Sequence, residues 1–341
     1  MRPPGTLLAL MAVFAAAGAA CVGWVVQPLA GAQAPQATAT VDPARLEQHV
    51  RALSEQFFPR SFDHPAHLDA AADYVRDELQ AAGASVHEHA YLHEGMRWRN
   101  LSARFGPGQG PVLVIGAHYD SHADAPRRAL DESRPLALTH TPGADDNASG
   151  VAGLIELART LAGHPPARPV ELVAYTLEEP PYFRTPAMGS MQHAQALRSA
   201  GTEVELMVSL EMIGYFSDAP QSQHYPLPGL GWIYPEQGNF IAVVGRLQDV
   251  AQTRALKAWM RGASPLPVHS INAPPALVGV DFSDHLSYWA HGYPALMVTD
   301  TAFFRNAAYH EAGDTADRLD YRRMAQVVQA VAAFALRPAG P

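Results

Sequence analysis

Five groups of polar residues could bind metal ions, judged by their side-chain types. They are His118-Tyr119-Asp120, Asp145-Asp146-Asn147, Glu178-Glu179, Glu211 and Tyr309-His310. Zinc accepts imidazole nitrogens and carboxylate oxygens, and one carboxylate can bridge two ions about 3.5 Å apart. Each group alone has an ordinary explanation, such as a helix N-cap or a solvated loop. Together they form a coordination set of two histidines and several carboxylates.

The glutamates narrow the chemistry further. Glu211 directly follows Met207-Val208-Ser209-Leu210, a run that should be buried. Because an unpaired buried carboxylate is costly, we expect a cation beside it. Glu178 and Glu179 are neighbours in an extended segment, so their side chains point to opposite sides. One of them can face a metal ion, which leaves the other free to act as a base.

Alternating strands and helices must position these groups. Alternating polarity and short apolar runs predict strands over residues 84–91, 97–105, 112–117, 170–176, 204–210, 240–244 and 295–298. Helical spacing and capping patterns predict helices over residues 42–57, 67–82, 148–161, 188–200, 249–261, 284–290 and 321–336. The sequence therefore predicts an α/β fold with a mixed, mostly parallel central sheet flanked by helices on both faces.

The polar groups fall at or just after the C-terminal ends of predicted strands, where open α/β sheets bind their ligands. Residues 215–239 are rich in Pro, Gly, Tyr and Gln. We expect a long loop there that forms a pocket wall.

Composition limits the function classes. The net charge is −9 with scattered Lys and Arg, which argues against nucleic-acid binding. Cys21 is the only cysteine and precedes the folded region, so disulfide and thiol chemistry are not expected there. No feature indicates an obligate protein partner.

The N-terminal segment, residues 1–34, has the pattern of an export signal. It begins with Arg2, continues through an apolar stretch from Thr6 to Val26 and ends in Ala32-Gln33-Ala34. The apolar stretch is also long enough to remain as an N-terminal membrane anchor, and lipid attachment at Cys21 is a further option. Each alternative places the protein outside the cytoplasm, in the periplasm, the extracellular space or on a membrane. We expect residues 35–41 to form a linker and residues 42–341 a single domain.

The motifs resemble those of metallopeptidase family 28, which includes co-catalytic zinc aminopeptidases and glutamate carboxypeptidase II. The resemblance extends from Val112 to Thr315. It rests on His118-Tyr119-Asp120, Gly143-Ala144-Asp145-Asp146-Asn147-Ala148-Ser149-Gly150, Glu178-Glu179, Glu211-Met212-Ile213-Gly214 and Tyr309-His310 with Asp314-Thr315. It implies a zinc-exopeptidase domain of the phosphorylase/hydrolase-like fold that acts on peptide substrates, most simply by removing N-terminal residues.

The resemblance also implies a ligand set for two zinc ions per chain. Asp146 would bridge the ions, His118 and Glu211 would complete one site, and Glu179 and His310 would complete the other.

Four further residues receive roles by the same resemblance. Glu178 would be the general base that activates a water lying between the zinc ions, and Tyr309 would donate a hydrogen bond to the oxyanion. Asp120 would orient His118, and Asp314 would support a neighbouring ligand.

Some positions depart from the family pattern or have competing interpretations. Glu211 stands where the aminopeptidases usually have Asp, and Pro180–Pro186 is an insertion that should rebuild one wall of the substrate pocket. The family often has a non-proline cis peptide bond at the position of Asp146-Asn147. Ser283-Asp284 precedes a predicted helix, and we expect it to serve as an N-cap.

Other functions share the expected fold. A carboxypeptidase or dipeptidase would need a basic side chain for the substrate's C-terminal carboxylate, and the candidates are Arg184, Arg246 and Arg305. A glutaminyl cyclase would use a single zinc ion. A metal-free binding module, as in receptor ectodomains, would lack ligands, whereas none is missing here.

Overall fold

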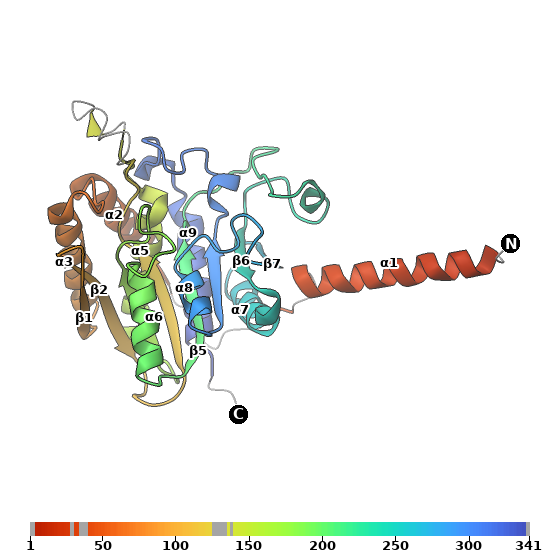
Figure 1. The fold of residues 1–341 in the computed structure, drawn as a ribbon, viewed down its shortest axis with the longest axis horizontal. Helices are drawn as coiled ribbons and strands as arrows, with labels where there is room; N and C mark the ends of the chain where they lie inside the picture. The colour runs from red at the N-terminus through yellow and green to blue at the C-terminus, as the bar shows by residue number, and fades with distance from the viewer. Residues whose placement is uncertain (1–3, 28–30, 34–39, 125–134, 137–138, 339–341) are drawn as a thin grey trace.

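A computed structural model describes residues 4–27, 31–33, 40–124, 135–136 and 139–338. The described chain contains an eight-stranded sheet in the order β1-β2-β4-β3-β5-β8-β6-β7 (Figure 1). The strands are β1 (Val86–His93), β2 (Met96–Phe105), β3 (Val112–His118), β4 (Val170–Tyr175), β5 (Val204–Glu211), β6 (Ile241–Gly245), β7 (Val268–Asn272) and β8 (Ala295–Thr299). The central strands β4, β3, β5 and β8 are parallel, whereas β1, β2 and β6 pair antiparallel with their inner neighbours. The predicted mixed, mostly parallel sheet is confirmed.

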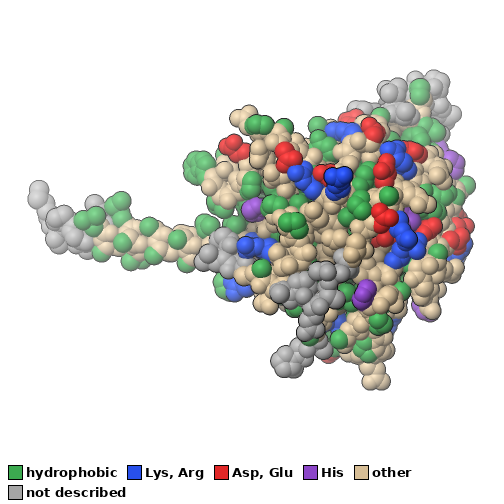
Figure 2. Space-filling view, turned by 180° about the vertical axis from the view of Figure 1, so that it is seen from behind, with side chains coloured by type: hydrophobic (Ala, Val, Ile, Leu, Met, Phe, Trp, Pro, Cys, Tyr) green, Lys and Arg blue, Asp and Glu red, His purple; other side chains and the backbone are tan. Residues whose placement is uncertain are grey.

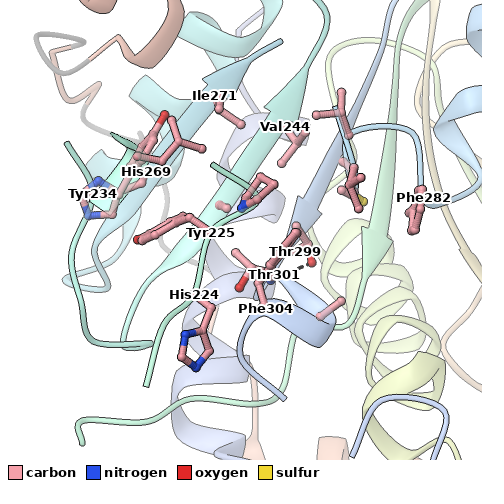
Figure 3. Close-up of a pocket in the computed structure, with 18 of the residues that line it drawn as sticks. His224, Tyr225, Tyr234, Val244, His269, Ile271, Phe282, Thr299, Thr301 and Phe304 are labelled. Carbon is pink, nitrogen blue, oxygen red and sulfur yellow. Dashed lines mark hydrogen bonds between the residues drawn. The ribbon is translucent and has the colours of Figure 1, made fainter. Parts of the chain in front are cut away.

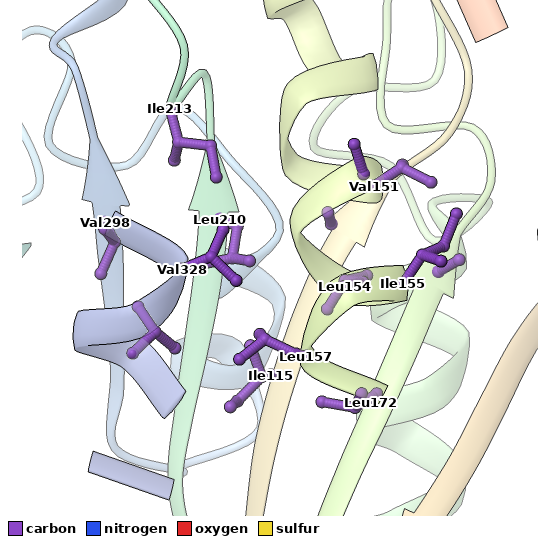
Figure 4. Close-up of a cluster of buried hydrophobic side chains, with 14 of the residues drawn as sticks. Ile115, Val151, Leu154, Ile155, Leu157, Leu172, Leu210, Ile213, Val298 and Val328 are labelled. Carbon is purple, nitrogen blue, oxygen red and sulfur yellow. The ribbon is translucent and has the colours of Figure 1, made fainter. Parts of the chain in front are cut away.

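Helices cover both faces of this sheet. On one face lie α2 (Pro43–Arg51), α3 (Pro65–Ala81), α5 (Gly150–Gly163), α7 (Val250–Ala263) and α9 (Tyr321–Ala335), and on the other lie α6 (Gly189–Ser199) and α8 (His285–Ala290). The larger core lies under the first set. Figure 4 shows Leu154 and Leu157 of α5 and Val328 of α9 facing Ile115 and Leu210 of the sheet. Full burial of each such side chain contributes roughly 1.5–3 kcal/mol, so this layer holds the central strands in place.

The structure differs from the sequence prediction at one strand and one helix. Strand β7 was not predicted, because the sequence of Val268–Asn272 places polar side chains at His269 and Ser270 and has no apolar alternation. The helix expected over residues 42–57 is α-helical only to Arg51 and continues as a π-helical turn over Ala52–Gln56.

Helix α1 (Pro4–Val26) projects from the domain (Figure 1). Residues Leu8–Val26 have a mean hydropathy of 2.2 and are almost entirely exposed. By length and composition this segment could cross a membrane, and a secretory signal has the same character.

Candidate metal centre

The central parallel strands bring the predicted ligands to one edge of the sheet. His118 is the last residue of β3, and Glu211 is the last residue of the adjacent strand β5. Glu178 and Glu179 follow the end of β4 on the other side of β3. His310 comes from the loop that follows β8. Because parallel strands end at the same edge, residues far apart in sequence meet there.

Asp146 lies at the centre of this group, in the segment η3 (Ala144–Ser149), and is joined to Asn147 by a non-proline cis peptide bond, as expected. Its Oδ1 lies 3.3 Å from Nε2 of His118, and its Oδ2 lies 3.2 Å from Nε2 of His310. Oε2 of Glu211 is 3.4 Å from the His118 nitrogen, and Oε2 of Glu179 is 3.2 Å from the His310 nitrogen. Each oxygen of Asp146 therefore faces its own histidine–glutamate pair.

The carboxylates in this group outnumber the histidines and raise the pKa values of both histidines. Burial lowers the pKa of His310, but the carboxylates of Glu179 and Asp146 outweigh it and raise that pKa to about 11. Burial likewise opposes protonation of His118, yet Glu211 and Glu178 raise its pKa well above the ordinary value. Such a group of carboxylates is typical of a site that holds cations.

The donor set fits zinc. Among the described residues, buried Nε2 of His118 and buried Oε1 of Glu179 lack a hydrogen-bond partner. Buried polar atoms of this kind call for an explanation such as an ion. Imidazole nitrogen and carboxylate oxygen are zinc ligands, and ligand atoms of His118, Asp146 and Glu179 all lie within 4.8 Å of one another. These residues could therefore hold metal ions.

Glu178 lies beside this ligand group and has a different environment from Glu179. Its Oε2 is 3.9 Å from Nε2 of His118. Burial raises the pKa of Glu178 well above its ordinary value, and the carboxylates of Glu211 and Glu179 add to that effect against the opposing charge of His118. A carboxyl group with a raised pKa can accept and return a proton near neutral pH.

Two aspartates support the ligands through the backbone. The carboxylate of Asp120 accepts hydrogen bonds from the N–H groups of Glu178 at 3.2 Å and Glu179 at 3.0 Å, and its Oδ1 lies 3.4 Å from Nδ1 of His118. The carboxylate of Asp314 accepts from the N–H groups of Asp145 and Asp146. Asp120 thus contacts two ligand-bearing loops, and Asp314 holds the central loop.

Arg60 supports the same loops, and this role was not predicted from the sequence. Its buried guanidinium donates to the carbonyl of Tyr119, next to Asp120, and to the carbonyls of Pro142 and Gly143, which precede Asp146. No periodic pattern or motif singles out this arginine, because its partners are backbone atoms brought together only by the fold.

The prediction that the side chains of Ser283-Asp284 cap the following helix is wrong. Asp284 precedes α8, but its side chain makes no capping hydrogen bond. The hydroxyl of Ser283 instead donates to Oε2 of Glu211 at 2.7 Å and lies 2.7 Å from the hydroxyl of Ser209. Ser283 therefore positions a predicted ligand.

Aromatic rings enclose His310. The ring of Tyr309 stacks on it with 3.8 Å between centroids, and the ring of His122 stacks on it at 3.9 Å. Nδ1 of His122 also lies 3.4 Å from Oε2 of Glu179. Burial raises the pKa of Tyr309 well above the ordinary value, so its phenol stays protonated and can donate a hydrogen bond. His122 is a residue of this centre that the sequence analysis did not select.

An apolar pocket adjoins the ligand group at Glu211. Tyr225 and Tyr234 from the long loop line this pocket together with Phe304 and strand residues such as Ile271 (Figure 3). The expectation that residues 215–239 line a pocket is confirmed for this part of the loop. Among the described residues, the pocket lining contains no lysine or arginine.

The insertion after Glu179 contributes to this wall indirectly. Phe183 packs edge-on against Phe282, a lining residue, with 6.0 Å between ring centroids. Arg184 lies over both rings and pairs with Asp281 at 2.6 Å.

The other two candidate carboxylate-binding arginines are also paired within the protein. Arg246 bonds to Asp249 at 2.8 Å. Arg305 donates to the side chain of Gln223 and the carbonyl of Tyr215.

Comparison with known proteins agrees with the geometry. The family model of peptidase family M28 matches residues 100–335 of this chain. Over 297 residues the chain is 49% identical to the uncharacterized protein YfbL of Escherichia coli K12, which covers 87% of this chain and 88% of that protein. Leucine aminopeptidase 1 of Coccidioides posadasii is 25% identical over 272 residues, and the match spans only 62% of that fungal protein.

Solved structures share the fold. The LapA aminopeptidase of Legionella pneumophila superposes with a TM-score of 0.64 at 20% identity, covering 86% of this chain and 69% of that one. A glutaminyl cyclase of Bacteroides thetaiotaomicron superposes with a TM-score of 0.66 at 18% identity, covering 89% and 100%. The family match spans most of the chain and contains all five groups of polar residues, which confirms the resemblance found in the sequence. This protein therefore belongs to peptidase family M28 and is a hydrolase with the fold of the zinc exopeptidases.

Proposed function

We propose that this protein is an aminopeptidase with two zinc ions, which removes apolar residues from the N-termini of peptides. The observation that carries this proposal is the arrangement around Asp146, whose two oxygens face separate histidine–glutamate pairs beside an apolar pocket. One zinc would be held by His118, Glu211 and one oxygen of Asp146. The other would be held by Glu179, His310 and the second oxygen.

Zinc bound there would polarise the scissile carbonyl and lower the pKa of the attacking water. Glu178 takes the proton from that water and passes it to the leaving amine, a role supported by the raised pKa of its buried carboxyl. The phenol of Tyr309 donates a hydrogen bond to the oxygen on which negative charge develops. Asp120 and Asp314 keep the ligand loops in register.

The preference for N-terminal apolar residues rests on the charges around the pocket. Its described lining residues include no lysine or arginine, and burial lowers the pKa of His269 within it to about 4, so this imidazole is neutral at pH 7. Away from Glu211 at its edge, the pocket is mainly aromatic and aliphatic, which favours an apolar side chain. Carboxypeptidase activity has less support, because Arg184 and Arg246 are engaged with aspartates and Arg305 with Gln223 and a backbone carbonyl.

The test uses the full-length protein in detergent with aminoacyl nitroanilides carrying Leu, Phe, Ala, Lys or Glu, each with a free or acetylated amine. We expect cleavage of the free-amine Leu and Phe substrates, loss of activity on chelation and recovery with zinc. Lack of cleavage across the panel while two zinc ions remain bound would refute the aminopeptidase. Cyclisation of peptides with N-terminal glutamine by the same preparation would identify a glutaminyl cyclase instead.

A further inference from the structure

The C-terminal end of α1 is built into the folded domain. Most of α1 is exposed, but Val26 and Gln27 are buried. The side-chain amide of Gln27 donates to the carbonyl of Val250 at the start of α7 and to the side chain of Asn272 at the end of β7, at 3.1 and 2.7 Å. The helix therefore does not meet the domain through a free linker alone.

Lys257 of α7 depends on this connection. Its buried ammonium donates to the carbonyls of Val26 at 3.2 Å and Gln27 at 2.9 Å, and to the hydroxyl of Ser270 at 3.1 Å. Removal of residues 1–34 would take away two of these three acceptors. A buried charge that loses its acceptors destabilises the fold, so the folded domain is more stable when the C-terminal end of α1 remains attached.

A second apolar element lies on an exposed loop. Within Leu227–Ile233, the side chain of Trp232 is 93% exposed, that of Leu227 50% and that of Ile233 41%. Trp232 is the most exposed large hydrophobic residue among those the structure describes. Tryptophan beside aliphatic residues is typical of segments that rest at a membrane–water interface.

The loop and α1 project from the same side of the domain. Figure 1 shows both beyond the β6–β7 end of the sheet, and the loop with its short helix reaches past the point where α1 begins to leave the domain. Arg254 and Arg261 are exposed on α7, where the end of α1 docks, and Arg254 lies 6.0 Å from the ring of Trp24. Figure 2 shows basic side chains beside the base of the projecting helix. Basic residues at this position favour anionic lipid headgroups.

We propose that this protein is attached to a lipid bilayer at two places, with α1 retained as a membrane-spanning anchor and the Leu227–Ile233 loop inserted into the adjacent headgroup region. A bilayer crossed by α1 has its surface near Val26, at the level that the loop reaches in Figure 1.

This attachment has a consequence for substrate access. Pro226, Leu230 and Tyr234, in or beside the loop, line the apolar pocket next to Glu211. The rim of the pocket then lies at the membrane surface, and peptides whose N-termini lie close to the bilayer reach it first. This consequence rests on the proposed aminopeptidase function, whereas the membrane contact does not.

The contact can be tested with spin labels on the full-length protein in nanodiscs of phosphatidylethanolamine and phosphatidylglycerol. Cys21→Ser removes the only cysteine, and Trp232→Cys then carries the label. Leu227→Cys provides a second position on the loop. The matched control is Leu92→Cys, an apolar residue that is 78% exposed on β1, at the opposite edge of the sheet.

We expect labels at residues 227 and 232 to collide more often with oxygen than with a water-soluble nickel chelate, and the label at residue 92 to show the reverse. Equal, water-like accessibility at all three positions would overturn the loop contact. The intact mass of protein extracted from membranes tests the anchor: we expect the uncleaved N-terminus, and loss of residues 1–34 would overturn the proposal. Neither readout depends on peptide hydrolysis, so a failure here is distinct from a failure of the proposed function.

Discussion

Arg60 offers a stringent test of how this fold holds its metal centre. Its guanidinium is fully buried and donates to four backbone carbonyls, those of Leu53, Tyr119, Pro142 and Gly143. Burial lowers its pKa to about 10, so it remains charged at pH 7. Arg60→Met keeps much of the side-chain volume but leaves all four carbonyls without this donor.

The size of the effect follows from these contacts. A hydrogen bond to a charged group contributes roughly 1.5–3 kcal/mol, so four independent bonds would sum to about 6–12 kcal/mol, as much as the whole stability of a typical domain. Bonds that share one side chain are not additive, but each buried carbonyl left without a donor costs roughly 1–3 kcal/mol. We therefore expect Arg60→Met to lower the free energy of unfolding by about 3–5 kcal/mol, less than the simple sum for four carbonyls.

The assay is urea denaturation of the full-length, metal-free protein in detergent, followed by circular dichroism. The matched control is Arg97→Met, since Arg97 is exposed on β2 and pairs only with Glu88 among the described residues. An exposed pair of this kind contributes ~0–1 kcal/mol. If Arg60→Met changes stability no more than Arg97→Met does, the inference that Arg60 ties the ligand loops together is wrong.

Three further predictions concern single substitutions. If the proposed function holds, Glu178→Gln should bind as much zinc as the unaltered protein by elemental analysis but lose ~10²–10⁴-fold in kcat with a nitroanilide substrate, and unchanged kcat would exclude Glu178 as the base. Ser283→Ala removes a hydrogen bond to Glu211 and should weaken zinc affinity ~10–100-fold in competition with a chelator, whereas unaltered affinity would make that contact incidental. Burial would raise the pKa of Asp63, but hydrogen bonds led by that of His140 hold this pKa well below the ordinary value. The ionised carboxylate of Asp63 therefore stabilises the fold at pH values above its unfolded pKa of ~3.9, and this stabilisation is lost as the pH falls below that value. Asp63→Asn should therefore cost ~1 kcal/mol in urea denaturation at pH 7 and progressively less below about pH 4, and a pH-independent difference would contradict this assignment.

Much of the fold could be predicted from local pattern. The central strands read as continuous apolar runs because both faces of the sheet are covered, and the helices between them have helical spacing. Strand β7 was not predicted because two of its three buried positions are the polar residues Ser270 and Asn272, so its alternating burial leaves no apolar pattern in the sequence.

The predicted ligands could be selected from the sequence because zinc chemistry restricts residue types and because parallel strands bring their C-terminal ends together. His118, Asp146, Glu179, Glu211 and His310 follow from that restriction together with the family resemblance. Residue types alone could not show which oxygen of Asp146 faces which histidine, since this depends on the orientation of side chains from separate loops.

Asp120 and Asp314 were expected to support the centre from the family resemblance, whereas the supporting roles of Arg60 and Ser283 were decided only by the tertiary structure. Arg60 acts through backbone carbonyls, and Ser283 acts through a hydroxyl that reaches Glu211 across 72 positions. A hydrogen bond to a backbone carbonyl places no demand on the identity of its partner, so it leaves no trace in sequence pattern. The sequence by itself determined which side chains are candidates for binding zinc, and three-dimensional packing determined what holds those side chains in place.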